Sequence, residues 1–340
     1  MTYSDFVRSL RPLTISRPGG IRLDLLALGA RITGLWVPNG SGGYVDVVLG
    51  HDRLEDYLIH AGHIGTTCGR YANRIAQARF RLDDREIRLD RNHGAHTLHG
   101  GSEGFDRKIW EVESQSSEQV NLTLVSPDGD MGFPGDLRVS CRYRLVSDHA
   151  LMIEMTARTN ATTVVNLANH AYFNLAGQGT GEVLDHQLRL YADHYTPVDS
   201  GLIPTGEIRS VADTPFDFRQ PRVIRASMPG PEGLDNNFCL SAPTESRHGE
   251  ALRPAAELLD PLSKRRLKVW TNEIGLQVYT GGHFDGSQPG KGGTRYGRFA
   301  GIALETQKFP DSPNRSKFPS ARLDPGQLYR HLVVYDFSPD

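Results

Sequence analysis

Histidine and carboxylate side chains occur in this chain where a strand-like alternation of residues breaks. The stretch NHAYFNLAG, residues 169–177, places His170 beside Asn169 and two aromatic residues. Glu305 follows the apolar run FAGIAL, where a buried strand should end, and a carboxylate is rarely buried without a partner or a function. Imidazole and carboxyl groups are well suited to proton transfer near neutral pH. Both residues are therefore candidates for acid–base chemistry, although each one alone is equally compatible with a structural role.

Two further segments combine polar side chains with glycine-rich turns. HTLHGG carries His96 and His99 three residues apart, a spacing that metal ligands can have, but spacing places no third ligand. The alternative is a histidine that hydrogen-bonds its own backbone in a loop. GRYANRI presents Arg70, Asn73 and Arg74, which form either a solvated charge pattern or a clamp for hydroxyl or carboxylate groups.

Two strand-like segments each offer one more candidate. LDNNF contains Asp235, for which an Asx-turn is the structural alternative. GLQVYTGG contains Gln277 between Leu276 and Val278. Because successive side chains of a strand point to opposite faces, Gln277 should point away from the face that these two apolar residues share.

The elements that must position these residues show the period-2 alternation of strands. LRVSCRYRL (137–145) predicts a half-buried strand, and LMIEMTART, FRLDDREIRLD and the C-terminal YRHLVVYDF alternate in the same way. RPAAELLD (253–260) fits a strand or a single helical turn. Many strands separated by Gly- and Pro-rich turns, without βαβ alternation, predict antiparallel sheets packed as a large sandwich or barrel with few helices.

Nothing in the sequence marks a domain boundary. The most linker-like segment, SAPTESRHGEALRP (241–254), is short and polar, so we interpret it as a surface loop. Residues 1–340 are therefore expected to form a single domain.

Composition restricts the possible partners and the compartment. Lys and Arg (38) nearly balance Asp and Glu (40), which argues against nucleic acid and acidic membrane surfaces and favours a small molecule or another protein. The three cysteines are far apart and are expected to be reduced and inert. No apolar run predicts secretion or membrane insertion, so we expect a cytoplasmic protein.

Taken together and in order, the motifs resemble those of the aldose 1-epimerase (galactose mutarotase) family. They are GRYANRI, LHGGSEGFDRKIWEV, SPDGDMGFPGDL, NHAYFNLAG, YTPVDSGLIPTGEI, LDNNF, GLQVYTGG and LETQKFPDSPN. The resemblance extends from about Leu25 to Phe337. It implies an all-β fold, the large antiparallel β-supersandwich of that family, in agreement with the alternation.

The resemblance also implies a role for each matched residue. His170 corresponds to the general acid, Glu305 to the general base, and His99 to a second histidine that contacts the sugar near the reacting carbon. The matched hydroxyl-binding positions and the matched pocket residue are Asn73, Arg74, Asp235, Gln277 and Tyr172.

The implied reaction interconverts the α and β anomers of free aldohexoses such as D-galactose and D-glucose. It needs two opposed proton carriers and no metal, nucleotide or covalent intermediate. For this work Glu305 should be ionised, and His170 should be partly protonated near neutral pH. The resemblance leaves the preferred sugar open and fits a monomer or a homodimer.

Three alternatives have their own sequence requirements. A hexose-6-phosphate 1-epimerase should add a cationic cluster for the phosphate. A glycosidase would use a carboxylate pair, such as Asp235 and Glu305. A non-catalytic sugar-binding protein of the same fold would keep the hydroxyl contacts without the pair formed by His170 and Glu305.

Overall fold

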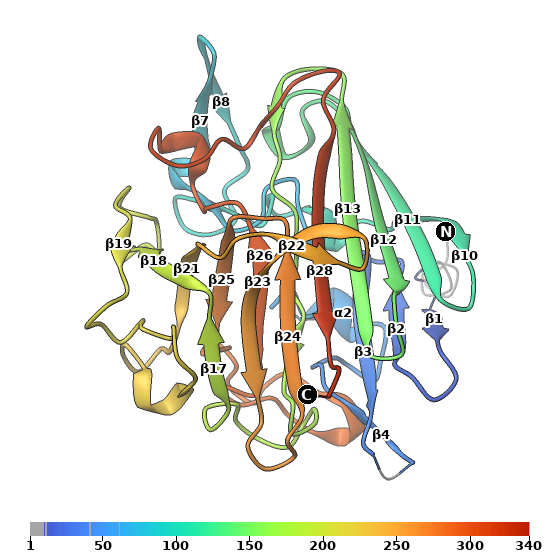
Figure 1. The fold of residues 1–340 in the computed structure, drawn as a ribbon. Coiled ribbons are helices and arrows are strands. Elements are labelled where there is room, and N and C mark those ends of the chain that lie inside the picture. The colour runs from blue at the N-terminus through green and yellow to red at the C-terminus, as the bar shows by residue number, and fades with distance from the viewer. Residues whose placement is uncertain (1–9, 11, 41, 61, 340) are drawn as a thin grey trace.

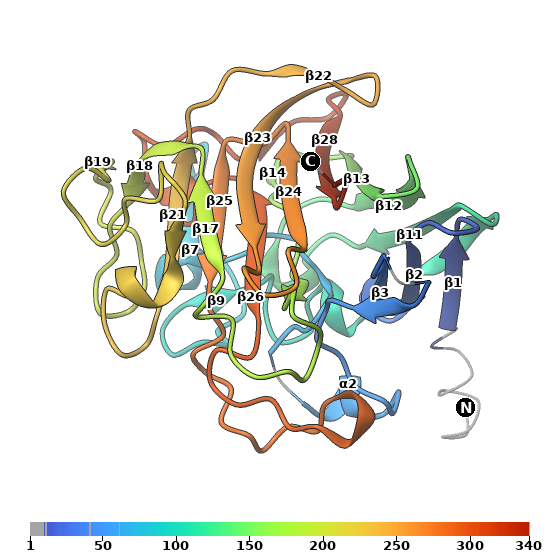
Figure 2. The same ribbon diagram turned by 60° about the horizontal axis from the view of Figure 1, so that its bottom comes forward.

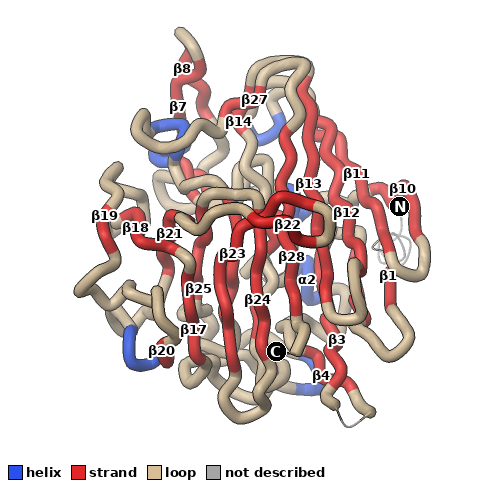
Figure 3. Tube along the Cα trace, in the orientation of Figure 1, coloured by secondary structure: helices blue, strands red, loops and turns tan. Residues whose placement is uncertain are grey.

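A computed structural model describes residues 10, 12–40, 42–60 and 62–339, and strands make up most of its regular structure (Figures 1 and 3). The largest sheet has ten strands. In order across the sheet they are β10 (Glu111–Gln115), β11 (Gln119–Ser126), β12 (Leu137–Leu145), β13 (Ala150–Thr159), β28 (Tyr329–Asp336), β24 (Arg266–Thr271), β23 (Glu250–Leu259), β17 (Gln187–Leu190) and β20 (Arg222–Val223), with β22 (Glu245–Arg247) paired to β23.

Two smaller sheets have six and four strands. The six-stranded sheet has the order β16 (Tyr172–Phe173), β26 (Ile302–Gln307), β25 (Gly275–Tyr279), β21 (Asp235–Leu240), β18 (Ala192–Thr196) and β19 (Arg209–Ser210). The four-stranded sheet has the order β1 (Pro12–Ser16), β2 (Arg22–Leu26), β3 (Arg31–Pro38) and β4 (Tyr44–Asp46).

Short strand pairs and helical turns complete the described part of the chain. The pairs are β5 (Thr67–Cys68) with β15 (Ala168–Asn169), β6 (Arg74–Ile75) with β9 (Thr97–Leu98), β7 (Arg79–Leu82) with β8 (Arg85–Arg88), and β14 (Thr163–Val164) with β27 (Arg322–Leu323). The helical turns are α2 (Asp56–Ile59), η1 (Ala76–Ala78), η2 (Phe105–Arg107), η3 (Asp130–Gly132), η4 (Ile224–Ser227), η5 (Lys291–Gly293) and η6 (Ser312–Asn314). None of the helices in these residues is long and apolar enough to cross a membrane.

The ten-stranded and six-stranded sheets pack against each other and share one apolar core. Ile153 of β13 and Val269 of β24 belong to the same buried cluster as Val278 of β25 and Leu304 of β26. Figure 1 and the turned view of Figure 2 both show β25 and β26 alongside the part of the large sheet that carries β23 and β24. This arrangement confirms the predicted antiparallel β-sandwich with few helices.

Local predictions agree with the structure at most points. The stretch 137–145 is β12, and its side chains alternate between buried and exposed along most of its length. Residues 253–259 lie in β23, where Pro254 sits at a register shift, a position in a sheet that tolerates proline. The interpretation of 241–254 as a loop is wrong in part, because Glu245–Arg247 forms β22 and folds back on β23. This hairpin is possible because β22 needs only one partner strand and leaves its other edge to water.

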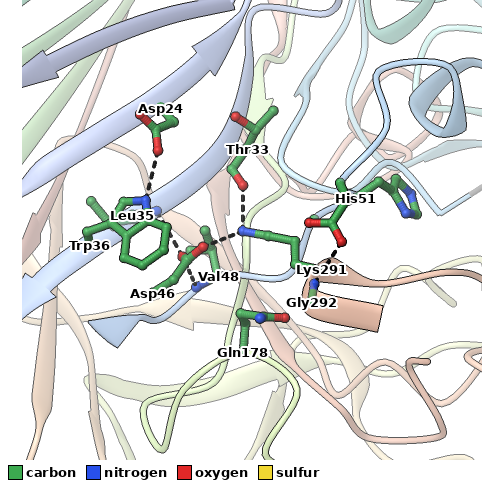
Figure 4. A network of polar contacts seen from close by, with 12 residues as sticks. Asp24, Thr33, Leu35, Trp36, Asp46, Val48, His51, Gln178, Lys291 and Gly292 are labelled. Atoms are coloured by element: carbon green, nitrogen blue, oxygen red, sulfur yellow. Dashed lines mark hydrogen bonds and ion pairs between the residues drawn. The ribbon is translucent and has the colours of Figure 1, made fainter. Parts of the chain in front are cut away.

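A buried ion pair fastens the long loop between β25 and β26 to the four-stranded sheet (Figure 4). Lys291 Nζ lies 2.5 Å from Asp46 Oδ2 and donates to the carbonyl oxygen of Thr33. Asp46 Oδ1 accepts the backbone N–H groups of Leu35 and Val48 at 3.1 and 3.2 Å. Burial raises the pKa of Asp46, and the charge of Lys291 opposes this shift. Lys291 therefore anchors this loop to the four-stranded sheet.

Candidate active site

A cavity of about 470 Å³ opens over one face of the six-stranded sheet, where several loops meet that face. It is lined by Gly62, His63, Asn73, Arg74, Asn92, His93, Leu98, His99, His170, Tyr172, Leu202, Asp235, Tyr279, His283 and Glu305. Seven of the eight residues proposed from the sequence are in this set. The eighth, Gln277, reaches the cavity wall through Asp235, whose Oδ1 accepts a hydrogen bond of 2.6 Å from Gln277 Nε2.

The strand register explains why these side chains meet. Glu305 of β26 is paired directly with Gln277 of β25, and Tyr279 two residues on is paired with Asp235 of β21. Paired residues and residues two apart share one face of a sheet. Glu305, Gln277, Tyr279 and Asp235 therefore project from the same face, and the opposite face carries the core residues Leu276, Val278 and Leu304. The prediction that Gln277 points away from its apolar neighbours is confirmed.

His170 is held at the cavity by its backbone. It lies between β15 and β16; its N–H donates to the carbonyl of Thr66 at 2.8 Å, and its carbonyl accepts the N–H of Gly65 at 2.9 Å. Asn169 adds a side-chain bond to the Gly65 carbonyl and accepts the N–H of Ala171. These bonds join the segment NHAYFNLAG to the chain around residue 65 and fix the backbone of His170 at the cavity.

The His170 imidazole faces the Glu305 carboxyl group. His170 Nε2 lies 3.4 Å from Glu305 Oε1, and their side chains are only 5% and 2% exposed. Glu305 Oε2 is buried and has no hydrogen-bond partner among the described residues, and the same holds for Gln277 Oε1 and Arg74 Nε. Unpaired buried polar atoms are costly, so a ligand rich in hydroxyl groups would offer these atoms hydrogen-bond partners.

Burial shifts both groups of this pair toward their neutral forms. It raises the pKa of Glu305 well above the usual range; Asp235 adds to the shift, and Arg74 opposes it. Burial also lowers the pKa of His170 to about 3, with further lowering from the charge of His63. Burial thus works against the expected arrangement of an ionised Glu305 beside a partly protonated His170, because both charges lose hydration in the cavity. The pair holds one proton in either arrangement, so it still supplies one acid and one base.

His99 presents a hydrogen-bond donor to the cavity. The backbone N–H of Asn73 donates to His99 Nδ1 at 3.1 Å, and the His99 N–H donates to the Asn73 carbonyl at 3.0 Å. Burial lowers the pKa of His99 well below its usual value, with a contribution from His63, so the ring is neutral. Because Nδ1 accepts a bond, the proton of the neutral ring is on Nε2.

The tautomer of His99 argues against a metal ion at this site. Ligand atoms of His99, His170 and Glu305 lie within 4.8 Å of one another, which is close enough to surround a metal ion. A metal needs a free lone pair on each nitrogen, however, and the proton of His99 occupies the nitrogen that is not bonded to Asn73. The donor set fits a sugar oxygen better than a metal ion.

Arg74 and Asp235 form a polar pair at the cavity wall. Arg74 Nη2 lies 3.6 Å from Asp235 Oδ2, and the Asp235 side chain is 24% exposed, so its carboxylate can accept hydrogen bonds from a ligand. Tyr172 lines the same cavity with its ring centroid 4.9 Å from that of His170. Phe173, one residue on, faces the core and contacts Tyr335, as strand alternation requires.

Other candidates lie outside the cavity. The buried guanidinium of Arg70 donates to the carbonyls of Pro134 and Gly135 and therefore braces a loop. His96 accepts the backbone N–H of Gln77 through Nδ1 at 3.1 Å, so the proposed metal spacing of His96 and His99 does not form a common site.

Sequence reasoning missed four lining residues with ionisable side chains: His63, His93, Tyr279 and His283. They come from three segments of the chain, since Tyr279 and His283 are only four residues apart, and no spacing links them to the motifs around His170 and Glu305. Only Tyr279 could have been predicted from the sequence, because it lies two residues after Gln277 and therefore on the same face of the strand.

The fold and the site together define an acid–base enzyme built on an antiparallel β-sandwich, with a pocket for a small polyhydroxylated molecule. Comparison with known proteins gives the family. The family model for aldose 1-epimerase matches residues 11–336. A galactose mutarotase of Bos taurus is 42% identical over 320 residues, covering 94% of this chain and 91% of the relative. An aldose 1-epimerase of Escherichia coli K12 is 37% identical over 335 residues, covering 96% and 95%.

Solved structures agree with this assignment. A GalM/aldose epimerase homologue from C. elegans superposes with a TM-score of 0.89 at 32% identity, covering 96% of this chain and 98% of the other. A galactose 1-epimerase from Lactobacillus acidophilus superposes with a TM-score of 0.82 at 29% identity, covering 96% and 94%. The chain belongs to the aldose 1-epimerase family, and it is an enzyme, a carbohydrate isomerase with mutarotase function.

Proposed function

We propose that this chain interconverts the α and β anomers of free aldohexoses such as D-galactose and D-glucose, with His170 and Glu305 as its proton carriers. The observation that carries the proposal is the separation of 3.4 Å between His170 Nε2 and Glu305 Oε1 in a cavity of sugar size. Galactose comes from the names of the relatives, galactose mutarotases from mammals among them. Glucose differs from it only at one hydroxyl.

The reaction moves two protons and breaks one bond. With the shared proton of the pair on His170 and Glu305 ionised, Glu305 takes the proton of the C1 hydroxyl while His170 gives a proton to the ring oxygen O5. The C1–O5 bond then opens to an aldehyde. Rotation about the C1–C2 bond presents the other face of the carbonyl, and the same two proton transfers in reverse close the ring as the other anomer. Since the pair holds one proton throughout, the net charge of the buried site is constant, which suits a poorly hydrated cavity.

The other proposed residues bind the sugar. His99 donates from Nε2 near C1, and Asn73, Arg74, Asp235 and Gln277 hold the remaining hydroxyls. Tyr172 forms a wall against the ring. A site built on such hydrogen bonds discriminates against sugars that leave its polar groups unpaired, since each unpaired group costs binding energy.

The charge of the cavity favours a neutral sugar over a hexose 6-phosphate. Among its described lining residues, Arg74 is the one lysine or arginine, and it faces Asp235. Burial lowers the pKa of His93 and of His283, so these rings add little positive charge at neutral pH. Phosphate sites usually combine several cationic donors.

We also propose the wider setting of this activity. The chain acts as a single catalytic domain over residues 1–340, as a monomer or a homodimer, in the cytoplasm. Its partner is a monosaccharide, and it binds neither nucleic acid nor membrane.

Polarimetry on freshly dissolved α-D-galactose and α-D-glucose tests the proposal. The protein should speed the approach to anomeric equilibrium, and His170→Ala should reduce this acceleration about 10²- to 10⁴-fold. His194→Ala, which removes an exposed imidazole on β18, is the matched control and should behave as the unaltered protein. Equilibration at the buffer rate with the unaltered protein would overturn the proposal, and equal rates for the two variants would overturn the role of His170.

A further inference from the structure

The buried histidine His331 does not line the cavity, but it contacts both segments that carry His170 and Glu305. It belongs to β28, in the middle of the ten-stranded sheet (Figure 1), and it is fully buried. Burying an imidazole is costly unless its polar atoms find hydrogen-bond partners. The partners of His331 therefore show what its side chain does in the fold.

Each ring nitrogen of His331 has one partner. Nδ1 lies 3.0 Å from the carbonyl oxygen of Leu167, three residues before His170, and Nε2 lies 2.8 Å from the Thr306 hydroxyl, next to Glu305 in β26. Because a carbonyl can only accept, Nδ1 carries a proton. Burial lowers the pKa of His331, so the ring is neutral, and Nε2 accepts the hydrogen bond of Thr306.

The chain that leads to His170 is held by β28 through both polar groups of one residue. The N–H of Leu167 donates to the Tyr329 hydroxyl at 3.0 Å, and the carbonyl of Leu167 accepts from His331. Tyr329 and His331 are two residues apart in β28 and therefore share one face of the large sheet. This face fixes the backbone just before the segment NHAYFNLAG.

The strand that carries Glu305 is held from its other face. Successive residues of a strand point to opposite faces, so Glu305 faces the cavity and Thr306 faces away from it. The Thr306 side chain is buried against the large sheet, where its hydroxyl meets His331. One imidazole thus joins the chain before His170 to the strand of Glu305.

We propose that His331 is a positioning residue for anomer exchange, because its ring joins Leu167 to Thr306 and so sets the separation of the backbones that carry His170 and Glu305. The inference rests on the proposed roles of His170 and Glu305 as proton carriers. It assigns to His331 no contact with the sugar. Placement matters because a shift of about 1 Å in a reacting group can reduce a rate about 100-fold.

Two substitutions test the bridge. His331→Phe keeps a ring of similar shape but loses both hydrogen bonds, and kcat should fall about 10- to 100-fold. KM should stay the same, because the proposed sugar-binding residues are not part of the bridge. Thr306→Val keeps the shape of the side chain and removes only the hydroxyl, so kcat should fall by a smaller factor. The double variant should be no slower than His331→Phe, since that change already removes the bond to Thr306.

His186→Phe is the matched control. His186 is also buried, does not line the cavity, and accepts the backbone N–H of Leu175 through Nε2 at 3.1 Å. Its replacement also removes a hydrogen bond between a buried imidazole and the main chain. This variant should unfold at a lower urea concentration, as His331→Phe should, but it should keep the unaltered kcat.

Initial rates of anomer exchange over a range of D-galactose concentrations, on variants shown to be folded by urea unfolding, separate the outcomes. An unaltered kcat for His331→Phe, or a raised KM with kcat unchanged, would overturn the proposal. An equal loss of kcat in His186→Phe would overturn it too, since any loosening of the core would then have the same effect. If His331→Phe does not fold, Thr306→Val decides, and an unaltered kcat contradicts the inference. Failure of the proposed function would look different, because the unaltered protein would then show no acceleration.

Discussion

Replacing Glu305 by glutamine should abolish catalysis and at the same time stabilise the protein. Glu305 is 2% exposed, and its Oε2 has no hydrogen-bond partner among the described residues. Ionising it inside the fold is unfavourable, which is why its pKa is raised well above the usual range by burial. Glutamine has nearly the same shape and no charge to bury.

The sign and size of the effect follow from the linkage between pKa and folding. A raised folded-state pKa contributes stability that is fully present below the unfolded pKa of about 4.3 and is lost as the pH rises toward the folded pKa. The loss is about 1.4 kcal/mol for each pH unit, so its ceiling at pH 7 is about 3 to 4 kcal/mol. Because Glu305 is coupled to His170, we expect Glu305→Gln to gain about 1 to 3 kcal/mol at pH 7 and nothing below about pH 4.

Urea unfolding across this pH range measures the gain, and polarimetry measures the activity, which should fall about 10²- to 10⁴-fold. Glu207→Gln, at an exposed glutamate paired with Arg209, is the control and should change the free energy of unfolding by less than about 0.5 kcal/mol. A variant at Glu305 that is less stable at pH 7, or equally stable at every pH, would refute the reasoning, because Glu305 would then be a favourable carboxylate in the fold.

Two other sites give further predictions. Asp235→Asn removes a charged acceptor for a sugar hydroxyl, and kcat/KM should fall about 30-fold, the equivalent of about 2 kcal/mol; Arg74→Lys, which loses the planar fork, should cost about tenfold. Initial rates over a range of sugar concentrations measure both, and unchanged values would remove these residues from the binding site. Lys291→Met leaves the buried Asp46 without its cation and should destabilise the protein by about 3 kcal/mol at pH 7. Adding Asp46→Asn should recover part of this loss in urea unfolding, and a second variant no more stable than the first would contradict the pairing.

Much of the fold was predictable because strand alternation is a local property. The residues of β12 alternate in the sequence as they do in the sheet. β13 shows where this fails: Met152 should face water by alternation, yet it is buried in a cluster with Leu252 and Trp270, because the chain around β22 and β23 covers that part of the large sheet. The residues that cover Met152 are about a hundred positions away in the sequence, so the local pattern around Met152 cannot predict its burial.

The candidate site divides in the same way. Glu305 and Gln277 could be placed because they belong to strands whose apolar neighbours define the other face. His170 could be assigned only with the motif around it. His63 could not be found, because only the fold, and not the sequence, brings it to the cavity beside His99. The pKa of His170 also depends on its burial. Strand alternation in the sequence does not predict this burial, because His170 lies between two strands.

The most direct test of the central claim is the comparison of His170→Ala, Glu305→Gln and the double variant in anomer exchange, followed by NMR on D-galactose. Two groups that act as one proton-transfer pair are not additive, since removal of either carrier already stops the concerted transfer. We therefore predict that the double variant is no more than a few-fold slower than the slower single variant. If the two effects instead multiply, or if either single variant keeps the unaltered rate, His170 and Glu305 do not work as a pair and the account is wrong.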